Sequence, residues 1–492
     1  MPSRSTQNQS NPEADRRHPE TGWALSRPTH AVAPTRELVA SQRQIGSATP
    51  DELYETLATL ARKFQVPGAQ LAVHNNGRTT AVSVGELEFG TGISVARDAA
   101  FPVGSLTKIC TAGVAMILVA DGDLDLDSPL GQYLPELERE LGKVLTLRHL
   151  LSHTGGLPDG PDSSAVIDAS VRRYVTTYGR SGHLVLRPGT GFSYSSVGYV
   201  VAGHLIESIT GMRWQDAVES ILMRPLGIEP VFLCSTGRHS PDRGLATGHS
   251  VSSALNRTRP VSQSLAPAEA PAGGLALSAA DLVGLGLTQR AGGAPPLFPA
   301  SCAEQMGQVV PEAHPLGLAD GWGLGLASFR GGSSTWLGHD GNAHGTACYL
   351  RIEPVTGTVV AMTSNASLGA LLWRELSTEL AGMGVPLPGY SANDDLGALA
   401  APPAGCTGTY VNCDTKYSVI EQDDGDYRLD IDSDAVARLT FHENLVFSSE
   451  DIASGDRAPA GRFVRDSDIG DITGIMVGGR VARRKSMPLL LS

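Results

Sequence analysis

The chain has 492 residues, of which 41% are hydrophobic and 18% charged, as in an ordinary globular protein with room for one large and one smaller domain. Its formal net charge of -13 argues against a nucleic-acid partner or an anionic membrane surface, because no basic stripe interrupts the acidic balance. The longest apolar run, at about residues 113–120, is far too short to cross a bilayer, so we expect no membrane partner.

The first 47 residues are polar and Pro-rich, and they predict a disordered tail without a signal peptide. The six cysteines show no CxxC pair and no metal-ligand spacing, which suits a reducing compartment. We therefore expect a cytoplasmic protein. Because HExxH, P-loop and strand-flanked GxGxxG motifs are missing, we expect no metal, nucleotide or flavin cofactor.

The elements that follow predict a layered α/β (α+β) domain over residues 48–383. Residues 48–64 have helical periodicity with Thr49 and Asp51 as candidate caps, and a period-two alternation around Asn76-Gly77 predicts a hairpin. Residues 121–317 are mostly helical, and four strands and a helix over 368–380 come after them. This order predicts an antiparallel sheet flanked by helices, with an all-helical insertion between its early hairpin and its late strands.

A second domain is predicted after residue 404. Residues 384–404 are small, Pro-rich and aperiodic, which is typical of a linker. From Thr407 onward, short alternating segments are separated by turn residues. Residues 405–492 therefore predict a small antiparallel β-barrel.

The segment "FPVGSLTKICTAGVAMILVADG" places a lysine one turn into an apolar helix. Only five of the 38 basic residues are lysines, so arginine is the usual cation of this chain. Burial lowers the pKa of a lysine towards that of a neutral amine, which can take a proton from a serine. Ser105 and Lys108 share one helix face, an arrangement typical of a Ser-Lys activated nucleophile. A capping serine beside a chance lysine is the alternative interpretation.

Four later segments make the interpretation more specific. They are "LTLRHLLSHTGGLP", "FSYSSVGYVVAGHLIESITG", "PAGGLALSAADL" and "GHDGNAHGTACYL". In order and spacing, together with Ser105 and Lys108, they resemble the serine hydrolase family that includes class C β-lactamases, D-alanyl-D-alanine carboxypeptidases, D-aminopeptidases and related esterases and acyltransferases. The resemblance covers roughly residues 51–380 and implies a β-lactamase/transpeptidase-like fold.

The resemblance implies a role for each matching residue. Ser105 matches the nucleophile and Lys108 its partner, while Tyr194 matches the tyrosine of the Tyr-x-Asn motif, which passes protons. His339 stands in the third motif before Asp340-Gly341, and the backbone N–H groups of Ser105 and Asn342 would form the oxyanion hole. We expect further substrate contacts near the motif positions Ser196 and Gly341 and at Gly273, which borders the cleft.

Two positions depart from the family pattern. Ser196 stands where β-lactamases and carboxypeptidases usually have Asn, so the amide contact to an acylamino substrate is shortened or lost. His339 replaces the Lys typical of class C β-lactamases. Both departures weaken the antibiotic-resistance interpretation, and neither disables acyl-enzyme chemistry.

The C-terminal barrel resembles the lipocalin-like appendage of D-aminopeptidases and of penicillin-binding-protein-type thioesterases, the stand-alone peptide cyclases of nonribosomal peptide pathways. In "GGRVARRKS", strand alternation places Arg480 and Arg484 on one side and Arg483 on the other. One of them could pair with a substrate carboxylate or a carrier phosphate. A solvated basic edge strand is the alternative.

The expected cytoplasmic location orders the functional hypotheses, since a cytosolic acyl enzyme needs a cytosolic acyl donor. The first is a stand-alone cyclase or thioesterase acting on peptidyl thioesters, held on a peptidyl carrier protein, in antibiotic biosynthesis. A D-stereospecific peptidase or esterase comes second, and a β-lactamase third. A non-catalytic penicillin-binding-like protein is a hypothesis of a different class, and Ser105, Lys108 and Tyr194 argue against it.

Overall fold

The computed structural model describes residues 48–234, 243–332, 334–388, 396–452, 455, 457–466 and 470–485. The predicted N-terminal tail, residues 1–47, lies outside the described residues, as does part of the predicted linker. Within the described part of the chain, no helix is both long and apolar enough to span a bilayer.

A seven-stranded antiparallel sheet forms the middle layer of the larger domain, with the order β2-β1-β12-β11-β10-β9-β8. The predicted hairpin at Asn76-Gly77 is confirmed, because Asn75 pairs with Arg78 across the turn and both turn residues have positive φ. The strands are β1 (Gly68–Asn75), β2 (Arg78–Gly85), β8 (Gly321–Trp322), β9 (Ala327–Gly331), β10 (Ser334–Ala343), β11 (Thr346–Glu353) and β12 (Thr358–Ser364).

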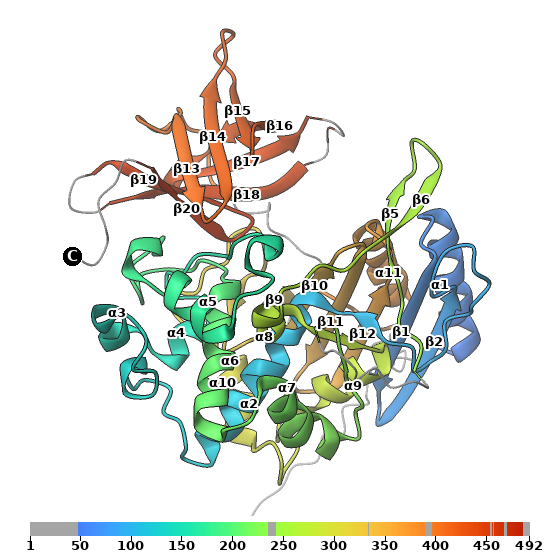
Figure 1. Ribbon diagram of the computed structural model, residues 1–492. Helices are drawn as coiled ribbons and strands as arrows, with labels where there is room; N and C mark the ends of the chain where they lie inside the picture. Colours follow the sequence, from blue (N-terminus) through green and yellow to red (C-terminus); the bar gives the residue numbers. More distant parts are fainter. Residues whose placement is uncertain are drawn as a thin grey trace, which may run out of the picture. The chain divides into compact units, whose positions relative to one another are not determined.

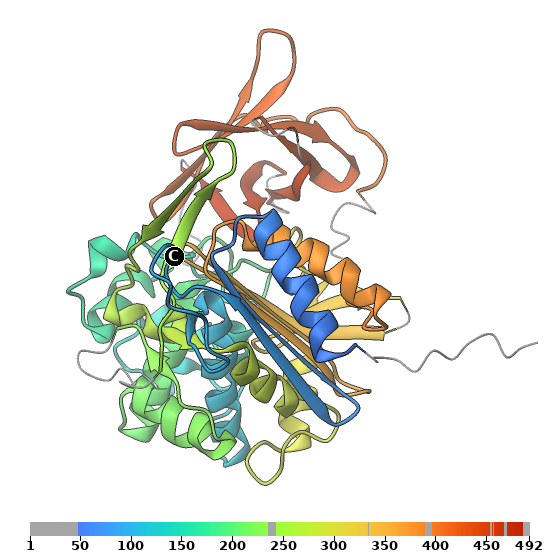
Figure 2. The same ribbon diagram turned by 90° about the vertical axis from the view of Figure 1, so that its right-hand side faces the viewer.

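Two helices, α1 (Pro50–Lys63) and α11 (Gly369–Gly382), lie side by side over one face of this sheet (Figure 2). Thr49 caps α1 as predicted, in a capping box with Glu52. The apolar sides of both helices pack with inward residues of β1, β11 and β12 in one core cluster. The chain therefore covers this face with its first and last helices.

The other face carries a larger helical body, which includes α2 and α9 (Figure 1). Its core is continuous with the sheet through residues such as Leu350 and Val359. Helix α2 runs through its centre and is buried on nearly every side, which explains the uninterrupted apolar sequence after Lys108. The helices are α2 (Thr107–Ala120), α3 (Arg139–Val144), α4 (Leu147–Leu151), α5 (Val171–Tyr178), α6 (Ser196–Thr210), α7 (Trp214–Ala217), α8 (Ala270–Gly273), α9 (Ala279–Gly286) and α10 (Ala300–Gly307), with 3-10 turns that include η1 (Gly104–Leu106), η3 (Ser163–Val166) and η7 (Pro267–Glu269).

The prediction that this insertion is all-helical is wrong. It also contains a three-stranded sheet, β3-β7-β4, and a hairpin, β5-β6. The hairpin turns at Asn256, which has a φ of 45° and no glycine beside it, so its turn lacks the usual sequence signal. The strands are β3 (Phe101–Pro102), β4 (Val231–Phe232), β5 (Gly248–Ser252), β6 (Arg257–Val261) and β7 (Leu275–Leu277).

The C-terminal residues form a closed antiparallel barrel of eight strands, as predicted. Aromatic side chains such as Tyr410, Phe447 and Phe463 fill its interior. The predicted domain limits stay predictions, and α11 and β13 lie on either side of the predicted linker. The strands are β13 (Gly408–Asn412), β14 (Thr415–Glu421), β15 (Tyr427–Ile431), β16 (Asp434–Phe441), β17 (Val446–Asp451), β18 (Arg457–Arg465), β19 (Ile472–Val477) and β20 (Arg480–Arg484).

Strand β10 and the turn before α2 approach each other closely enough to require glycine on both sides. A Cβ atom on Gly341 would lie 2.0 Å from the carbonyl oxygen of Val103, and one on Gly104 would lie 2.1 Å from that of Asn342. Gly104 also has a φ of 52°, which L side chains rarely adopt. This contact fixes Ser105 against the C-terminal part of β10.

We expect Gly341→Ala to lower the free energy of unfolding by about 1–3 kcal/mol, because the added methyl group must push β10 away from the turn. It should also slow the reaction of Ser105 with a fluorophosphonate. Denaturant unfolding and labelling rates would measure both effects. The matched control is Gly382→Ala in α11, where an added Cβ meets nothing within 4 Å. Equal stability of the two variants would contradict the proposed contact.

Candidate active site

Ser105 and Lys108 lie at the start of the central helix, where η1 leads directly into α2. The Nζ atom of Lys108 donates to Ser105 Oγ over 3.2 Å. The side chain of Lys108 is 1% exposed, although most lysines of soluble proteins reach water. The structure thus brings the predicted pair into hydrogen-bond contact.

Three oxygen atoms surround the amine of Lys108. Besides Ser105 Oγ, it contacts the carbonyl oxygen of Ala272 at 2.9 Å and Ser196 Oγ at 3.4 Å. Burial lowers the pKa of Lys108 to about 7, against an opposing effect of Asp159. A large fraction of this amine is therefore neutral at physiological pH and able to accept a proton from Ser105.

Two basic side chains, Lys108 and Arg480, lie close to the ring of Tyr194. Lys108 Nζ lies 5.0 Å from the centroid of its ring, and the guanidinium of Arg480 lies 4.8 Å from it. Burial raises the pKa of Tyr194, whereas its hydrogen bond with Ser105 and the charge of Arg480 act in the opposite direction. Tyr194 thus keeps its phenolic proton and lies beside Ser105 and Lys108, where it can pass a proton.

The imidazole ring of His339 is neutral, and only one of its two nitrogen atoms carries a proton. Its Nδ1 lies 2.6 Å from the carbonyl oxygen of Asp340, and a carbonyl can only accept, so Nδ1 carries the proton. Burial lowers the pKa of His339 to about 4. Its Nε2, which has no hydrogen-bond partner among the described residues, is left as an acceptor. The ring centroids of His339 and Tyr194 are 6.1 Å apart.

His153 packs against Tyr194 and supports its ring. Its ring stacks on that of Tyr194 with centroids 4.2 Å apart, and its Nδ1 accepts the backbone N–H of Ser195 at 3.0 Å. It has a φ of 58° and is fully buried. Its contacts are those of a residue that fixes the Tyr194 segment in place.

Asp159 connects the barrel to this site. Its carboxylate accepts from Arg480 Nε at 2.6 Å and from Ser196 Oγ at 3.4 Å. Its backbone N–H donates to Asn412 of the barrel, and the N–H of Tyr194 donates to Gly479. Two barrel strands thus hold the loop of Asp159 and the Tyr194 segment.

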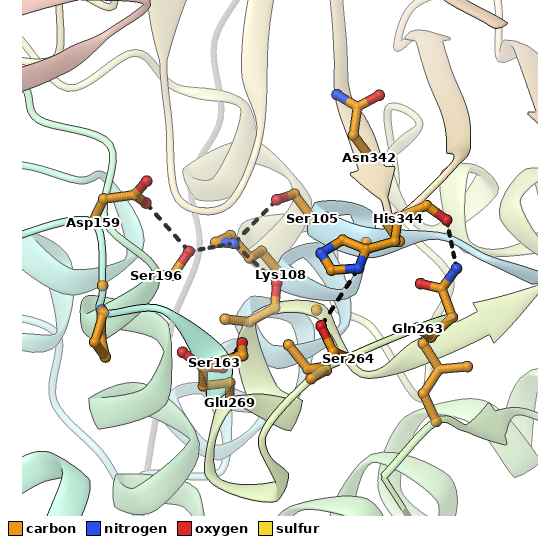
Figure 3. A pocket seen from close by; sticks show the side chains of 18 residues that line it. Ser105, Lys108, Asp159, Ser163, Ser196, Gln263, Ser264, Glu269, Asn342 and His344 are labelled. Atoms are coloured by element: carbon orange, nitrogen blue, oxygen red, sulfur yellow. Dashed lines mark hydrogen bonds between the residues drawn. The ribbon is translucent and has the colours of Figure 1, made fainter. Parts of the chain in front are cut away.

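Two cavities meet at Ser105 and Asn342, which line both. The Lys108 cavity, about 260 Å³, is lined by Lys108, Asp159, Ser196, Glu269, Gly273 and His344 among others (Figure 3). The Arg480 cavity, about 190 Å³, is lined by Tyr194, Trp322, His339, Asp340 and Arg480 among others. The hydroxyl of Ser105 is therefore accessible from two sides, which differ in charge.

The sequence profile of the Beta-lactamase family matches residues 53–378, about two thirds of the chain. The chain belongs to the beta-lactamase family of serine hydrolases. This match covers the sheet, its flanking helices and the insertion, but not the barrel.

Relatives of known sequence or structure agree with this family. Penicillin-binding protein 4 of Amycolatopsis lactamdurans is 32% identical over 351 residues, which are 68% of this chain and 90% of that protein. The unguisins hydrolase ungD' of Aspergillus campestris is 25% identical over 67% of this chain and 64% of its own length.

Among solved structures, SurE is 37% identical, with a TM-score of 0.79 over 88% of this chain and 98% of its own. SurE has also been solved with D-Leu, and that structure has a TM-score of 0.77 and 36% identity over 88% of this chain and 99% of its own. The similarity to SurE therefore extends beyond the catalytic domain into the barrel.

The structure brings most of the predicted site residues together, with one exception. Ser196, Gly273 and Asn342 line the Lys108 cavity, Arg480 lines the other cavity, and Gly341 lies under Ser105 in the close strand contact. Arg484 lies inside the barrel instead, where its guanidinium donates to barrel carbonyls and to Tyr410. The prediction for Arg484 is wrong, because its guanidinium is engaged by these barrel acceptors and lines neither cavity.

Sequence reasoning missed two carboxylates of the Lys108 cavity, Asp159 and Glu269. Asp159 lies in the loop "GLPDGPD", and Glu269 lies in the Ala-rich turn before α8. Neither belongs to a pattern with a known spacing, and only the folded chain places them near Lys108. No group of three or more potential metal ligands occurs within the described ranges.

We expect Asp159→Asn to shift the pH dependence of Ser105 labelling to lower pH. The negative charge of Asp159 raises the pKa of Lys108, so its removal lowers that pKa and leaves the amine neutral at lower pH. Rates of fluorophosphonate labelling across pH 5–9 would measure the shift. The matched control, Asp127→Asn, breaks a surface pair with Arg148 and should leave the profile unchanged, whereas an unshifted profile in Asp159→Asn would contradict the coupling.

Proposed function

We propose that this protein forms an acyl-enzyme at Ser105 and acts as a stand-alone peptide cyclase or thioesterase of a nonribosomal peptide pathway. Its substrate would be a cytoplasmic peptidyl thioester, carried on a peptidyl carrier protein and D-configured at its acyl residue. The observation that carries the proposal is the contact between Ser105 Oγ and an amine whose pKa is about 7.

In the acylation step, Lys108 takes the proton of Ser105 as Oγ attacks the thioester carbonyl. The backbone N–H groups of Ser105 and Asn342 would stabilise the oxyanion. Tyr194 passes a proton to the leaving sulfur as the carbon–sulfur bond breaks, and the proton on Lys108 replaces it. The products are a Ser105 ester and a free thiol.

In the second step, the amine at the start of the same peptide attacks the Ser105 ester. His339 lines the Arg480 cavity beside Tyr194 as a neutral ring, whose Nδ1 is committed to the carbonyl of Asp340. The proton lost by the amine returns through Tyr194 and Lys108 to Ser105 Oγ. The peptide leaves as a ring, and the enzyme is regenerated.

Three observations support the proposed substrate. Room on both sides of Ser105 suits two peptide segments that meet there. Arg480, supplied by the barrel, stands in one cavity, where it can pair with an anionic group of the substrate. SurE, which shares the catalytic domain and the barrel, has been solved with D-Leu, and this supports a D-configured acyl residue.

Hydrolysis of peptides is the second candidate function. The similarity to a protein named unguisins hydrolase favours it, since that match covers two thirds of this chain. The two functions share every step up to the acyl-enzyme and differ only in whether water or an amine releases the acyl group. A well-oriented intramolecular amine has an effective molarity of roughly 10⁵ M or more, enough to compete with water.

We expect a fluorophosphonate to add once to the intact protein and not to Ser105→Ala. Lys108→Ala and Tyr194→Phe should each slow turnover of an activated ester by on the order of 10²-fold or more, and His339→Ala should slow it less. Mass spectrometry and steady-state rates would measure these effects, with circular dichroism as the test of folding. An adduct on Ser105→Ala, or wild-type turnover by Lys108→Ala, would overturn the assignment.

We expect peptide pantetheine thioesters that end in a D-residue to give cyclic product, and their L-ended counterparts to give none. Chromatography and mass spectrometry separate the cyclic product from the linear one, and Ser105→Ala is the control for uncatalysed release. Linear acid from every substrate, with fast cleavage of D-amino-acid amides, would assign the protein as a hydrolase instead.

A further inference from the structure

The carboxylate of Glu269 is a buried charge in the wall of the Lys108 cavity. The residue ends η7, directly before α8, and is 5% exposed. It lines the same cavity as Ser105, and Figure 3 shows it beside Ser163. The acyl-transfer steps above make no use of it.

Two neutral hydroxyl groups hold this carboxylate. Tyr174 donates to its Oε1 at 3.2 Å, and Ser163 Oγ donates to its Oε2. Burial raises the pKa of Glu269 above its usual value, and the two hydroxyl donors and the charge of Lys108 offset this only in part. Each oxygen of the carboxylate keeps a lone pair for a further donor.

No cation of the described residues forms an ion pair with Glu269. Asp159, the other carboxylate of this cavity, is already paired with Arg480. Lys108 directs its amine to Ser105, Ser196 and the carbonyl of Ala272. A buried charge is costly unless it is paired, and the charge of Lys108 acts on Glu269 without an ion-pair contact, so this carboxylate has room for a closer cation.

Gly160 leaves the approach to Glu269 open. It lines the cavity, and a Cβ atom at this position would lie 3.3 Å from the hydroxyl of Tyr174 and 4.0 Å from Glu269 Oε1. Any larger residue would place its side chain over the carboxylate. The cavity is therefore open at the point where a donor from the substrate would reach Glu269.

We propose that Glu269, held by Ser163 and Tyr174, binds a primary ammonium group of the substrate inside the Lys108 cavity. The group is the free amino terminus of the linear peptide, because a peptidyl thioester always carries one there unless it is capped. This specificity rests on the proposed acyl-enzyme function. An ammonium supplies the missing charge and charge-assisted donors, whereas an acetylated terminus supplies neither charge nor more than one donor.

The test is protection of Ser105 from fluorophosphonate labelling by short linear peptides of graded length that end in D-Leu. Each peptide is used with a free amino terminus and in N-acetylated form, at neutral pH. We expect the free-amine peptides to protect at roughly tenfold lower concentration than the acetylated ones. Equal protection by both forms would overturn the ammonium site while leaving Ser105 labelling, and so the proposed function, intact. Absence of labelling would instead refute the proposed function.

Variants separate the carboxylate from the rest of the cavity. In Glu269→Gln, the free-amine peptides should lose their advantage and the acetylated peptides should protect as before. The matched control is Glu353→Gln, which changes a glutamate of equal exposure in β11 that does not line the cavity and should keep the advantage. Ser163→Ala keeps the carboxylate but removes one donor, so a partial loss is expected even if Glu269→Gln does not fold. An undiminished advantage in Glu269→Gln or Ser163→Ala would overturn the proposal.

Discussion

Burial of the Lys108 amine is the constraint on which the rest of the site depends. An ammonium in an apolar interior is stable only if oxygen atoms surround it, and here they come from η1, α6 and α8. Each of these elements must therefore be placed to within about an ångström. The fold achieves this by making α2 the central helix of the insertion, with α6 and α8 packed on it. The same desolvation that makes Lys108 costly also lowers its pKa to about 7, where it can act as a base.

The barrel contributes a charged side chain, Arg480, to this site. Arg480 brings a cation to the ring of Tyr194 and pairs with Asp159, whose negative charge opposes the effect of burial on Lys108. Backbone contacts fix the geometry, since Val481 donates to Ser193 Oγ at 3.1 Å and Asn412 bridges Asp159 and Val481. The C-terminal domain is thus part of the electrostatic environment of the Ser-Lys-Tyr group. Losing the barrel would leave Asp159 without its cation as well as opening the site to water.

The two sides of Ser105 present different charged groups. The Arg480 cavity contains Arg480 and Asp340 among aromatic rings, and the Lys108 cavity contains Lys108, Asp159 and Glu269. The proposed ammonium site at Glu269 and the guanidinium of Arg480 therefore lie on opposite sides of the nucleophile. A substrate with charged groups at both ends would be oriented by this separation.

Local patterns in the sequence were enough to predict several parts of the molecule. The Thr49 cap, the Asn76-Gly77 hairpin and the barrel strands depend on residues a few positions apart, as does the contact between Ser105 and Lys108 one helical turn away. The hairpin β5-β6 was not predicted from the sequence, because its turn at Asn256 has no glycine. Tyr194 and His339 followed from the order of motifs that resemble a known family, not from local physics.

Only the tertiary structure decided which charged side chains form ion pairs at the site. Asp159 and Arg480 are separated by 321 positions, and no periodicity relates them, yet their pairing sets the field around Lys108 and Tyr194. Strand alternation allowed either Arg480 or Arg484 to face the catalytic domain. Their positions along β20 decided the outcome, because Arg480 at the start of the strand pairs with Asp159, whereas Arg484 at its end donates to carbonyls of the barrel. Sequence fixes short-range geometry because the chain itself holds neighbouring residues together, whereas long-range pairs depend on how whole layers pack.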